Sequence, residues 1–357
     1  MTSATEARPP RLELRTVRLR GGLVAIGVVV LVGSGLLGVL IGPIGLSPTG
    51  ILRELVDRLP LANVSSGFSE QEAAILWQLR MPRVVLGGLV GAMLAISGAA
   101  YQGVFRNPLA DPFLLGVAAG AGLGATLAIA YLPSGADWPI NPLPVAAFAG
   151  ALIGVAATYL LGRSGGRTRS TATLILAGVA VASFMTAAQT FVQQRNADTI
   201  RQVYAWIFGT LGTAGWREVV LILPYVIVSG AALWLHRRLL DVMSVGDEEA
   251  GSLGVKSSRV RLIVVVAATL GTAAAVAVSG LIGFVGIIVP HTVRMLLGGS
   301  YRVVLPFSVV LGAAFLMLTD LLARTVISPS EIPIGVITAF FGAPFFMIVL
   351  RSSRRLA

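Results

Sequence analysis

Long apolar segments recur along this chain, and each is long enough to cross a lipid bilayer. A membrane-spanning helix needs about 20 consecutive, mostly apolar residues. Eight stretches meet this requirement, and a ninth, 262–298, is too long for one crossing and is interrupted at Ser279-Gly280 and Gly283. We interpret the ninth stretch as two spans, which predicts about ten spans in all. The eight single stretches are 22–41, 84–104, 113–132, 144–161, 172–194, 219–236, 304–323 and 333–350.

The composition excludes the common classes of soluble protein. Of the 357 residues, 55% are hydrophobic and only 12% are charged, whereas soluble domains carry about 25% charged residues. Such a chain cannot bury its apolar residues in one water-soluble core. We therefore predict an all-α, polytopic membrane protein rather than a soluble enzyme or a disordered chain. Its parts are a basic arm at 1–21, a transmembrane domain at 22–350 and a short tail at 351–357.

The net charge of +11 has an uneven distribution that indicates orientation. If the ten predicted spans are drawn through a membrane, 19 of the 27 basic residues fall on the side that carries both termini. Loops rich in Lys and Arg face the cytoplasm, so this pattern predicts that both termini are cytoplasmic. The basic charge therefore indicates no nucleic-acid partner, and the partner of the chain is membrane lipid. Arginine and alanine usage suggests a bacterial source, hence the bacterial cytoplasmic (inner) membrane.

Residues typical of catalytic, metal and nucleotide sites are missing from the sequence. There is no cysteine, and Lys256 stands in Gly-Val-Lys-Ser-Ser, without the glycine cradle of a phosphate-binding loop. His236 and His291 are far apart and form no zinc motif. We expect no catalytic residue, no metal site and no cofactor in this chain. Ion-coupled carriers need buried carboxylates or histidines, which are scarce here, so a secondary carrier or channel is the weaker alternative.

Several ordered motifs narrow the class further. In chain order they are Leu-Arg-Met-Pro-Arg at 79–83, Ser-Gly-Ala-Ala-Tyr-Gln-Gly at 97–103, Arg-Asn-Pro-Leu-Ala-Asp-Pro at 106–112, Asp-Glu-Glu-Ala-Gly-Ser-Leu-Gly-Val at 247–255, Gly-Phe-Val-Gly-Ile-Ile-Val-Pro-His at 283–291, Glu-Ile-Pro-Ile-Gly-Val at 331–336 and Gly-Ala-Pro-Phe-Phe at 342–346. Together they resemble the FecCD family, the membrane subunits of type II ABC importers for iron-siderophores, haem and cobalamin. The resemblance covers residues 75–350 and leaves the basic arm and the 42–72 loop outside.

The resemblance implies a ten-helix permease that imports a large metal chelate by alternating access. It implies a second permease subunit, with a homodimer favoured, and two ATP-binding cassette subunits that carry ATP and Mg²⁺. It also implies an extracytoplasmic substrate-binding protein, which would supply most of the selectivity.

A short amphipathic helix is expected in the long inner loop at about 240–256. Acidic residues at its start suit the positive end of a helix dipole, and a small apolar face follows them. The resemblance implies that this segment docks on the ATPase; a solvated loop is the alternative. The residues concerned are Asp247, Glu248, Glu249, Ala250, Leu253 and Gly254.

Three arginines lie at the predicted outer ends of helices: Arg80, Arg83 and Arg324. A guanidinium can pair with a carboxylate through two parallel hydrogen bonds. The resemblance implies that these three receive glutamates of the binding protein. Interfacial placement of a cation at a helix end is the alternative, and Arg324 could instead pair with Asp320 one helical turn earlier.

Two short inner connections are candidates for a cytoplasmic gate. Asn107 and Leu109 flank a proline in one, and Ser170, Thr171 and Ala172 form the other. The resemblance implies that they constrict the inner mouth of the pathway, whereas helix capping explains the same residue types. Ala172 departs from the small polar residue expected there.

Polar side chains on two spans are candidates for lining the pathway. In the fifth predicted span they recur at helical spacing, and the resemblance implies that the fifth and last spans line the route. Ordinary hydrogen bonding between helices is the alternative. The candidates are Met185, Thr186, Gln189, Gln193, Thr338 and Phe341.

Overall fold

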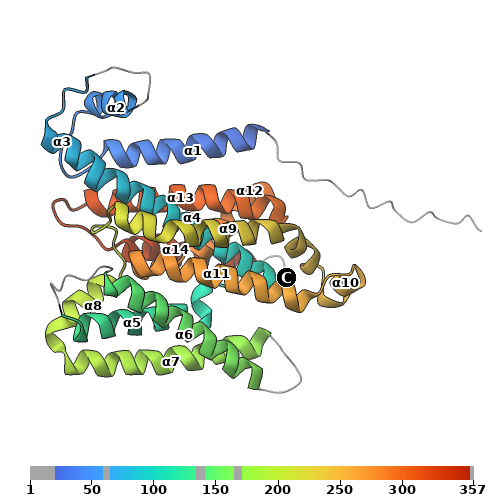
Figure 1. The fold of residues 1–357 in the computed structure, drawn as a ribbon. Coiled ribbons are helices and arrows are strands. Elements are labelled where there is room, and N and C mark those ends of the chain that lie inside the picture. Colours follow the sequence, from blue (N-terminus) through green and yellow to red (C-terminus); the bar gives the residue numbers. More distant parts are fainter. Residues whose placement is uncertain (1–20, 59–64, 134–140, 165–170, 354–357) are drawn as a thin grey trace, which may run out of the picture.

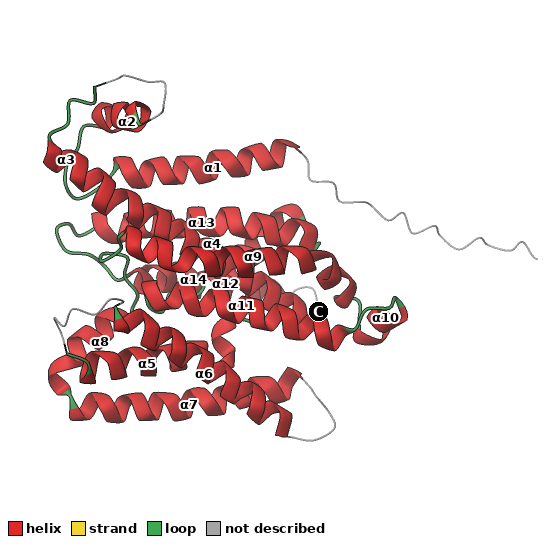
Figure 2. Ribbon diagram, viewed as in Figure 1, coloured by secondary structure: helices red, strands yellow, loops and turns green. Residues whose placement is uncertain are grey.

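The computed structural model describes residues 21–58, 65–133, 141–164 and 171–353, and within these ranges every regular element is a helix (Figure 2). Seven helices are long and apolar enough to cross a membrane, and three shorter apolar helices accompany them at Val117–Tyr131, Val285–Leu297 and Ile334–Val349. The all-α membrane architecture predicted from the sequence is confirmed. The number of ten spans stays a prediction.

The helices follow the order labelled in Figure 1. A π-helical turn, Ile75–Arg80, joins α3 to α4, and 3₁₀ turns at Pro112–Leu115 and Ala197–Thr199 precede α5 and α8. The α-helices are α1 Gly21–Leu40, α2 Pro48–Asp57, α3 Glu70–Ala74, α4 Met81–Phe105, α5 Val117–Tyr131, α6 Pro142–Ser164, α7 Thr171–Arg195, α8 Ile200–Ile207, α9 Trp216–Met243, α10 Asp247–Ser252, α11 Ser257–Ser279, α12 Val285–Leu297, α13 Tyr301–Thr325 and α14 Ile334–Ser353.

Helix α4 is the centre of the bundle and packs against α9, α11, α12 and α13. Helix α1 lies along α13 on one side, and α5, α6 and α7 form a second group that joins the centre through α11. Short helices mark the two ends of the molecule. We name them the α8 end, which also carries α2 and α3, and the α10 end, from which α10 projects (Figure 1).

Glycines allow the closest contacts between these helices. A methyl group built on Gly91 of α4 would overlap the carbonyl oxygen of Gly312 on α13, and one on Gly120 of α5 would overlap that of Gly150 on α6. In a bilayer there is little hydrophobic drive between helices, and close backbone packing through small residues replaces it. These glycines therefore mark helix contacts within this chain.

The long apolar stretch at 262–298 is divided as predicted. Helix α11 ends at Ser279 and α12 begins at Val285. The connection contains two left-handed residues, Gly280 with φ 71° and Phe284 with φ 68°. Helix α12 then packs on α4, where the Gln102 side chain donates a hydrogen bond of 3.0 Å to the Gly286 carbonyl.

The described parts of the 42–72 region, 42–58 and 65–72, contain helix α2 and the start of α3. Ser47 caps α2, and Ser69 forms a capping box with Glu72 at the start of α3. The indole of Trp77 donates a hydrogen bond of 3.0 Å to Glu54 of α2. These contacts fix α2 against the bundle at the α8 end.

Candidate functional site

The acidic start of the 240–256 segment is tied to the rest of the α10 end. Helix α10 begins at Asp247, as the sequence predicts for an amphipathic helix in this loop. The Asp247 carboxylate lies 3.0 Å from Arg261 Nη2 of α11 and 3.5 Å from Arg106 Nη2 at the end of α4. One carboxylate of α10 therefore contacts the ends of both α4 and α11.

The small apolar face of α10 divides into an inner and an outer part. Ala250 is fully buried within this chain, whereas Leu253 is 71% exposed. Glu248, Glu249 and Gly254 are also exposed. Of the predicted coupling residues, Leu253 is thus the one that offers a free apolar side chain to another protein.

Arg83 lies at the centre of an ionic cluster at the α8 end. Its guanidinium lies 2.8 Å from Asp320 on α13 and 2.7 Å from Glu331 in the connection to α14. Nε and Nη2 of Arg83 both donate to Asp320, and Nη1 and Nη2 both donate to Glu331. The cluster joins α4, α13 and the start of α14.

Arg80 and Arg324 are buried against helix α1, with 5% and 3% of their surface exposed. Arg80 donates hydrogen bonds to the carbonyls of Val39 and Ile44, and Arg324 donates to that of Gly38. Arg324 Nε also lies 3.4 Å from Asp320 Oδ2, one turn earlier. The pairing of Arg324 with Asp320, which the sequence left as an alternative, is confirmed, and docking by the three arginines stays a prediction.

Glu331 is the exposed member of this cluster, with 38% of its side chain accessible. The hydrogen bonds from Arg83 lower the pKa of the Glu331 carboxyl below its ordinary value, while partial burial acts in the opposite direction. Glu331 is therefore ionised at neutral pH and covers Arg83 from the outside. The sequence motif at 331–336 pointed to this segment, but nothing in it identified the partner of Glu331.

The first predicted gate connection forms a tight turn at the α10 end. The Asn107 side-chain oxygen accepts a hydrogen bond of 2.9 Å from the Leu109 amide, and Arg106 adopts a left-handed conformation with φ 50°. The turn leads α4 into the segment before α5.

The second predicted connection is only partly described. Thr171 is the first residue of α7 and Ala172 is exposed, while Ser170 lies outside the described residues.

The polar face of α7 borders a cavity of about 400 Å³. Thr186, Gln189 and Gln193 line it together with Tyr204 and Ile207 of α8. The spacing of these three residues therefore does place them in one cavity.

The remaining pathway candidates lie elsewhere in the structure. Met185 is buried, Thr338 is fully buried on α14, and Phe341 is exposed. None of these three lines the cavity beside α7.

Comparison with known proteins places this geometry in a family. The model of the FecCD transport family matches residues 29–352, which is most of the chain. This chain belongs to the FecCD transport family. The match begins at residue 29, so it includes α1 from that point onward and the 42–72 region that the motifs had left outside.

Named relatives agree with this assignment. The chain is 44% identical over 290 residues to the cobalamin import system permease BtuC of Halobacterium salinarum, covering 81% of this chain and 77% of BtuC. It is 40% identical over 291 residues to the hemin transport system permease HmuU of Yersinia pestis, covering 77% and 83%. A solved structure described as a metal-chelate type ABC transporter in an inward-facing conformation matches with TM-score 0.79 and 27% identity, covering 93% of this chain and 100% of that one.

The FecCD chain is therefore the multi-pass permease subunit of an ABC importer, with the type II importer permease fold, and it is not itself an enzyme. Membership of this family implies partners that supply ATP hydrolysis and substrate binding.

Proposed function

We propose that this permease imports a large metal chelate of the cobalamin, haem or iron-siderophore class. The observation that carries the proposal is the match over most of the chain to permeases named for cobalamin and hemin. The architecture of the structural neighbour, named for metal chelates, supports the same cargo class. No cofactor is needed in this chain, because ATP and Mg²⁺ bind to the partner ATPase.

The complex comprises two copies of this chain, two ATPase subunits and an extracytoplasmic binding protein, in a bacterial cytoplasmic membrane. The α10 end faces the cytoplasm and carries both termini, which the distribution of basic residues supports. The ATPase contacts the 240–256 segment at Leu253, the exposed apolar residue of the segment. Movement of α10 passes to α4 and α11 through Asp247, because Arg106 and Arg261 both hold that carboxylate.

The binding protein docks at the α8 end, where Arg83 is less deeply buried than Arg80 and Arg324, with 11% of its side chain exposed. A glutamate of the binding protein takes the place of Glu331 on Arg83, because Glu331 is the only one of its two carboxylate partners that reaches the surface. Arg80 and Arg324 are buried beneath this surface, and both donate hydrogen bonds to carbonyls of α1. The exchange of one carboxylate for another signals the arrival of the loaded binding protein.

Alternating access then moves the chelate past the polar face of α7. This face carries Thr186, Gln189 and Gln193, which border the cavity beside α7. The turn at Asn107–Leu109 and the start of α7 at Ser170–Ala172 close the inner mouth.

Reconstituted transport tests this proposal. The chain is incorporated into liposomes with the ATPase and binding protein of its own operon, and uptake of cyanocobalamin, haem and a ferric siderophore is measured with ATP present. We expect ATP-dependent uptake of one chelate class and stimulation of ATPase activity by its loaded binding protein. Stimulation by amino acids or simple sugars alone refutes the cargo class, and uptake by the chain alone along an ion gradient supports a secondary carrier instead.

A further inference from the structure

A small cavity at the α10 end has no place in the transport scheme above. It lies where the end of α6, the start of α7, the start of α11 and the end of α4 converge, and its volume is about 80 Å³. Its walls are mostly apolar, from Phe105, Val155, Leu174, Leu262 and Val265. This is room for several methylene groups, since a single water occupies about 10–15 Å³ on this measure.

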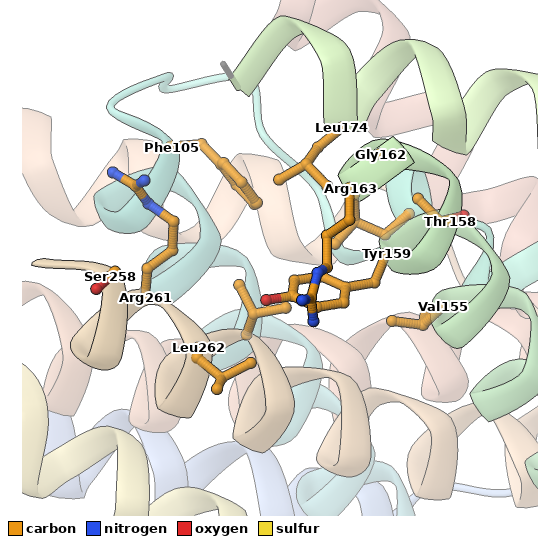
Figure 3. A pocket seen from close by; sticks show the side chains of 12 residues that line it. Phe105, Val155, Thr158, Tyr159, Gly162, Arg163, Leu174, Ser258, Arg261 and Leu262 are labelled. Atoms are coloured by element: carbon orange, nitrogen blue, oxygen red, sulfur yellow. The ribbon is translucent and has the colours of Figure 1, made fainter. Parts of the chain in front are cut away.

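Two arginines from different helices line this cavity. Figure 3 shows Arg163 of α6 extending toward the centre of the lining, and Arg261 of α11 at its edge with its guanidinium turned outward. No acidic side chain is among the described residues that line the cavity. The described lining therefore combines apolar walls with two positive charges and no acidic residue.

Both guanidiniums have unused hydrogen-bonding capacity. Arg163 is exposed and forms no salt bridge or side-chain hydrogen bond with any part of the chain that the structure describes. Arg261 uses Nη2 on Asp247, but its Nε is buried and has no acceptor among the described residues. A buried donor without an acceptor is costly, so a turn of the Arg261 side chain toward an anionic oxygen at the cavity would relieve that cost.

The surroundings of the cavity favour an amphiphile over a free anion. Leu160 and Leu161 on α6, Leu176 on α7 and Leu262 on α11 are large apolar side chains exposed on the same helix ends. In a bilayer these side chains contact lipid. A water-soluble phosphate would use the arginines and leave the apolar walls uncovered.

We propose that this cavity is a binding site for an anionic phospholipid of the membrane leaflet at the α10 end. The phosphate pairs with Arg163, Arg261 at the edge of the cavity adds its positive charge, and the first methylenes of an acyl chain lie against Leu174, Val155 and Leu262. Basic pockets between membrane helices are a recognised form of anionic lipid site. The inference does not depend on the identity of the transported cargo.

Occupation of this site bears on α10. Arg261 is shared, because it lines the cavity while its Nη2 lies 3.0 Å from Asp247. A phosphate on Arg261 draws part of its charge away from Asp247 and loosens α10 from α11. The lipid content of the membrane thereby adjusts the segment that we assign to ATPase docking.

Lipid retention by the full-length chain tests the site. The chain is placed in nanodiscs of phosphatidylcholine mixed equally with phosphatidylglycerol, extracted into mild detergent and analysed by native mass spectrometry for bound lipid. We expect retained phosphatidylglycerol in the unaltered chain and at least about a fivefold loss in Arg163→Gln and in Arg261→Gln, because each basic residue near the headgroups contributes a charge-dependent share of the binding. Arg259→Gln is the matched control, because Arg259 is an exposed arginine at the start of α11 that does not line the cavity.

A second variant tests the apolar part with both charges intact. A methyl group on Gly162 would lie 2.6 Å from Leu174 Cδ2, so Gly162→Ala pushes the Leu174 side chain into the cavity. We expect Gly162→Ala to lose phosphatidylglycerol while the elution profile of the purified protein is unchanged. Equal retention of phosphatidylcholine, an equal loss in Arg259→Gln, or displacement of the lipid by inorganic phosphate at low concentration would each overturn the proposal.

Discussion

Neutralising Asp320 tests whether the ionic cluster at the α8 end holds the fold together. Asp320 is almost completely buried and lies within salt-bridge distance of both Arg83 and Arg324. The Asp320→Asn substitution keeps the size of the side chain and removes its charge. Arg324 would then keep only its hydrogen bond to the Gly38 carbonyl, and Arg83 would keep only Glu331 as a carboxylate partner.

The magnitude follows from which partner is removed. Removing one member of a buried ion pair costs about 3–5 kcal/mol, because a buried charge is left uncompensated. Glu331→Gln removes the other carboxylate of Arg83, but that side chain is 38% exposed, and exposed pairs contribute about 0–1 kcal/mol. We therefore expect Asp320→Asn to lower the free energy of unfolding by several times as much as Glu331→Gln.

The assay is equilibrium unfolding by SDS in mixed micelles, followed by tryptophan fluorescence. A double-variant cycle sharpens it: Arg324→Met combined with Asp320→Asn should cost less than the sum of the two single changes, because the unpaired cation is gone. If Asp320→Asn costs no more than Glu331→Gln, the buried carboxylate does not stabilise the fold. If Arg324→Met and Asp320→Asn add without coupling, the two residues do not act as a pair.

Three further predictions concern the other parts of the molecule. Leu253→Asp should abolish co-purification of the ATPase and leave the fold intact, because Leu253 is exposed. Ala250→Asp should instead lower the yield of folded protein, because Ala250 is buried. A pull-down measures the first effect and size-exclusion chromatography the second. Gly91→Val should lower the free energy of unfolding by at least about 1–3 kcal/mol, the usual cost of overpacking a core. The reason is that the new side chain would overlap the carbonyl of Gly312, and SDS unfolding measures the change. The pKa of Glu331 is lower in the folded chain than in the unfolded chain. Its contribution to stability is therefore present above the unfolded pKa of about 4.3 and is lost as the pH falls through the folded pKa. Glu331→Gln should remove this part of the pH dependence of the free energy of unfolding.

The positions of the spans could be predicted because membrane helices are marked by their apolar side chains. The ends were less accurate, since hydropathy ends where charge begins while the helix continues into water. Helix α9 shows this: the predicted span 219–236 lies inside a helix that runs from Trp216 to Met243 and includes Arg237 and Arg238. The break at 280–284 was predicted from its glycines, but the left-handed conformation of Phe284 gave no sign in the sequence.

The charged contacts show where sequence reasoning stops. Arg324 and Asp320 are four residues apart on one helix, and this spacing alone suggested their pairing. Arg83 and Asp320 are 237 residues apart, and only the packing of α4 against α13 brings them together. In the same way, helical spacing placed Ala250 and Leu253 on one short helix, but which of them faces its own chain depends on how α10 rests on α9 and α11.

Three arginines at the α8 end differ from two exposed arginines at the α10 end in the acceptors that they contact. At the α8 end, Arg80, Arg83 and Arg324 each contact a carboxylate or a carbonyl of this chain. A partner there must compete with an internal acceptor, which makes docking an exchange that can be reversed in each cycle. At the α10 end, Arg163 and Arg259 are exposed and have no ionic partner among the described residues. A partner at that end meets free charge, so its attraction does not require anything in the chain to be displaced.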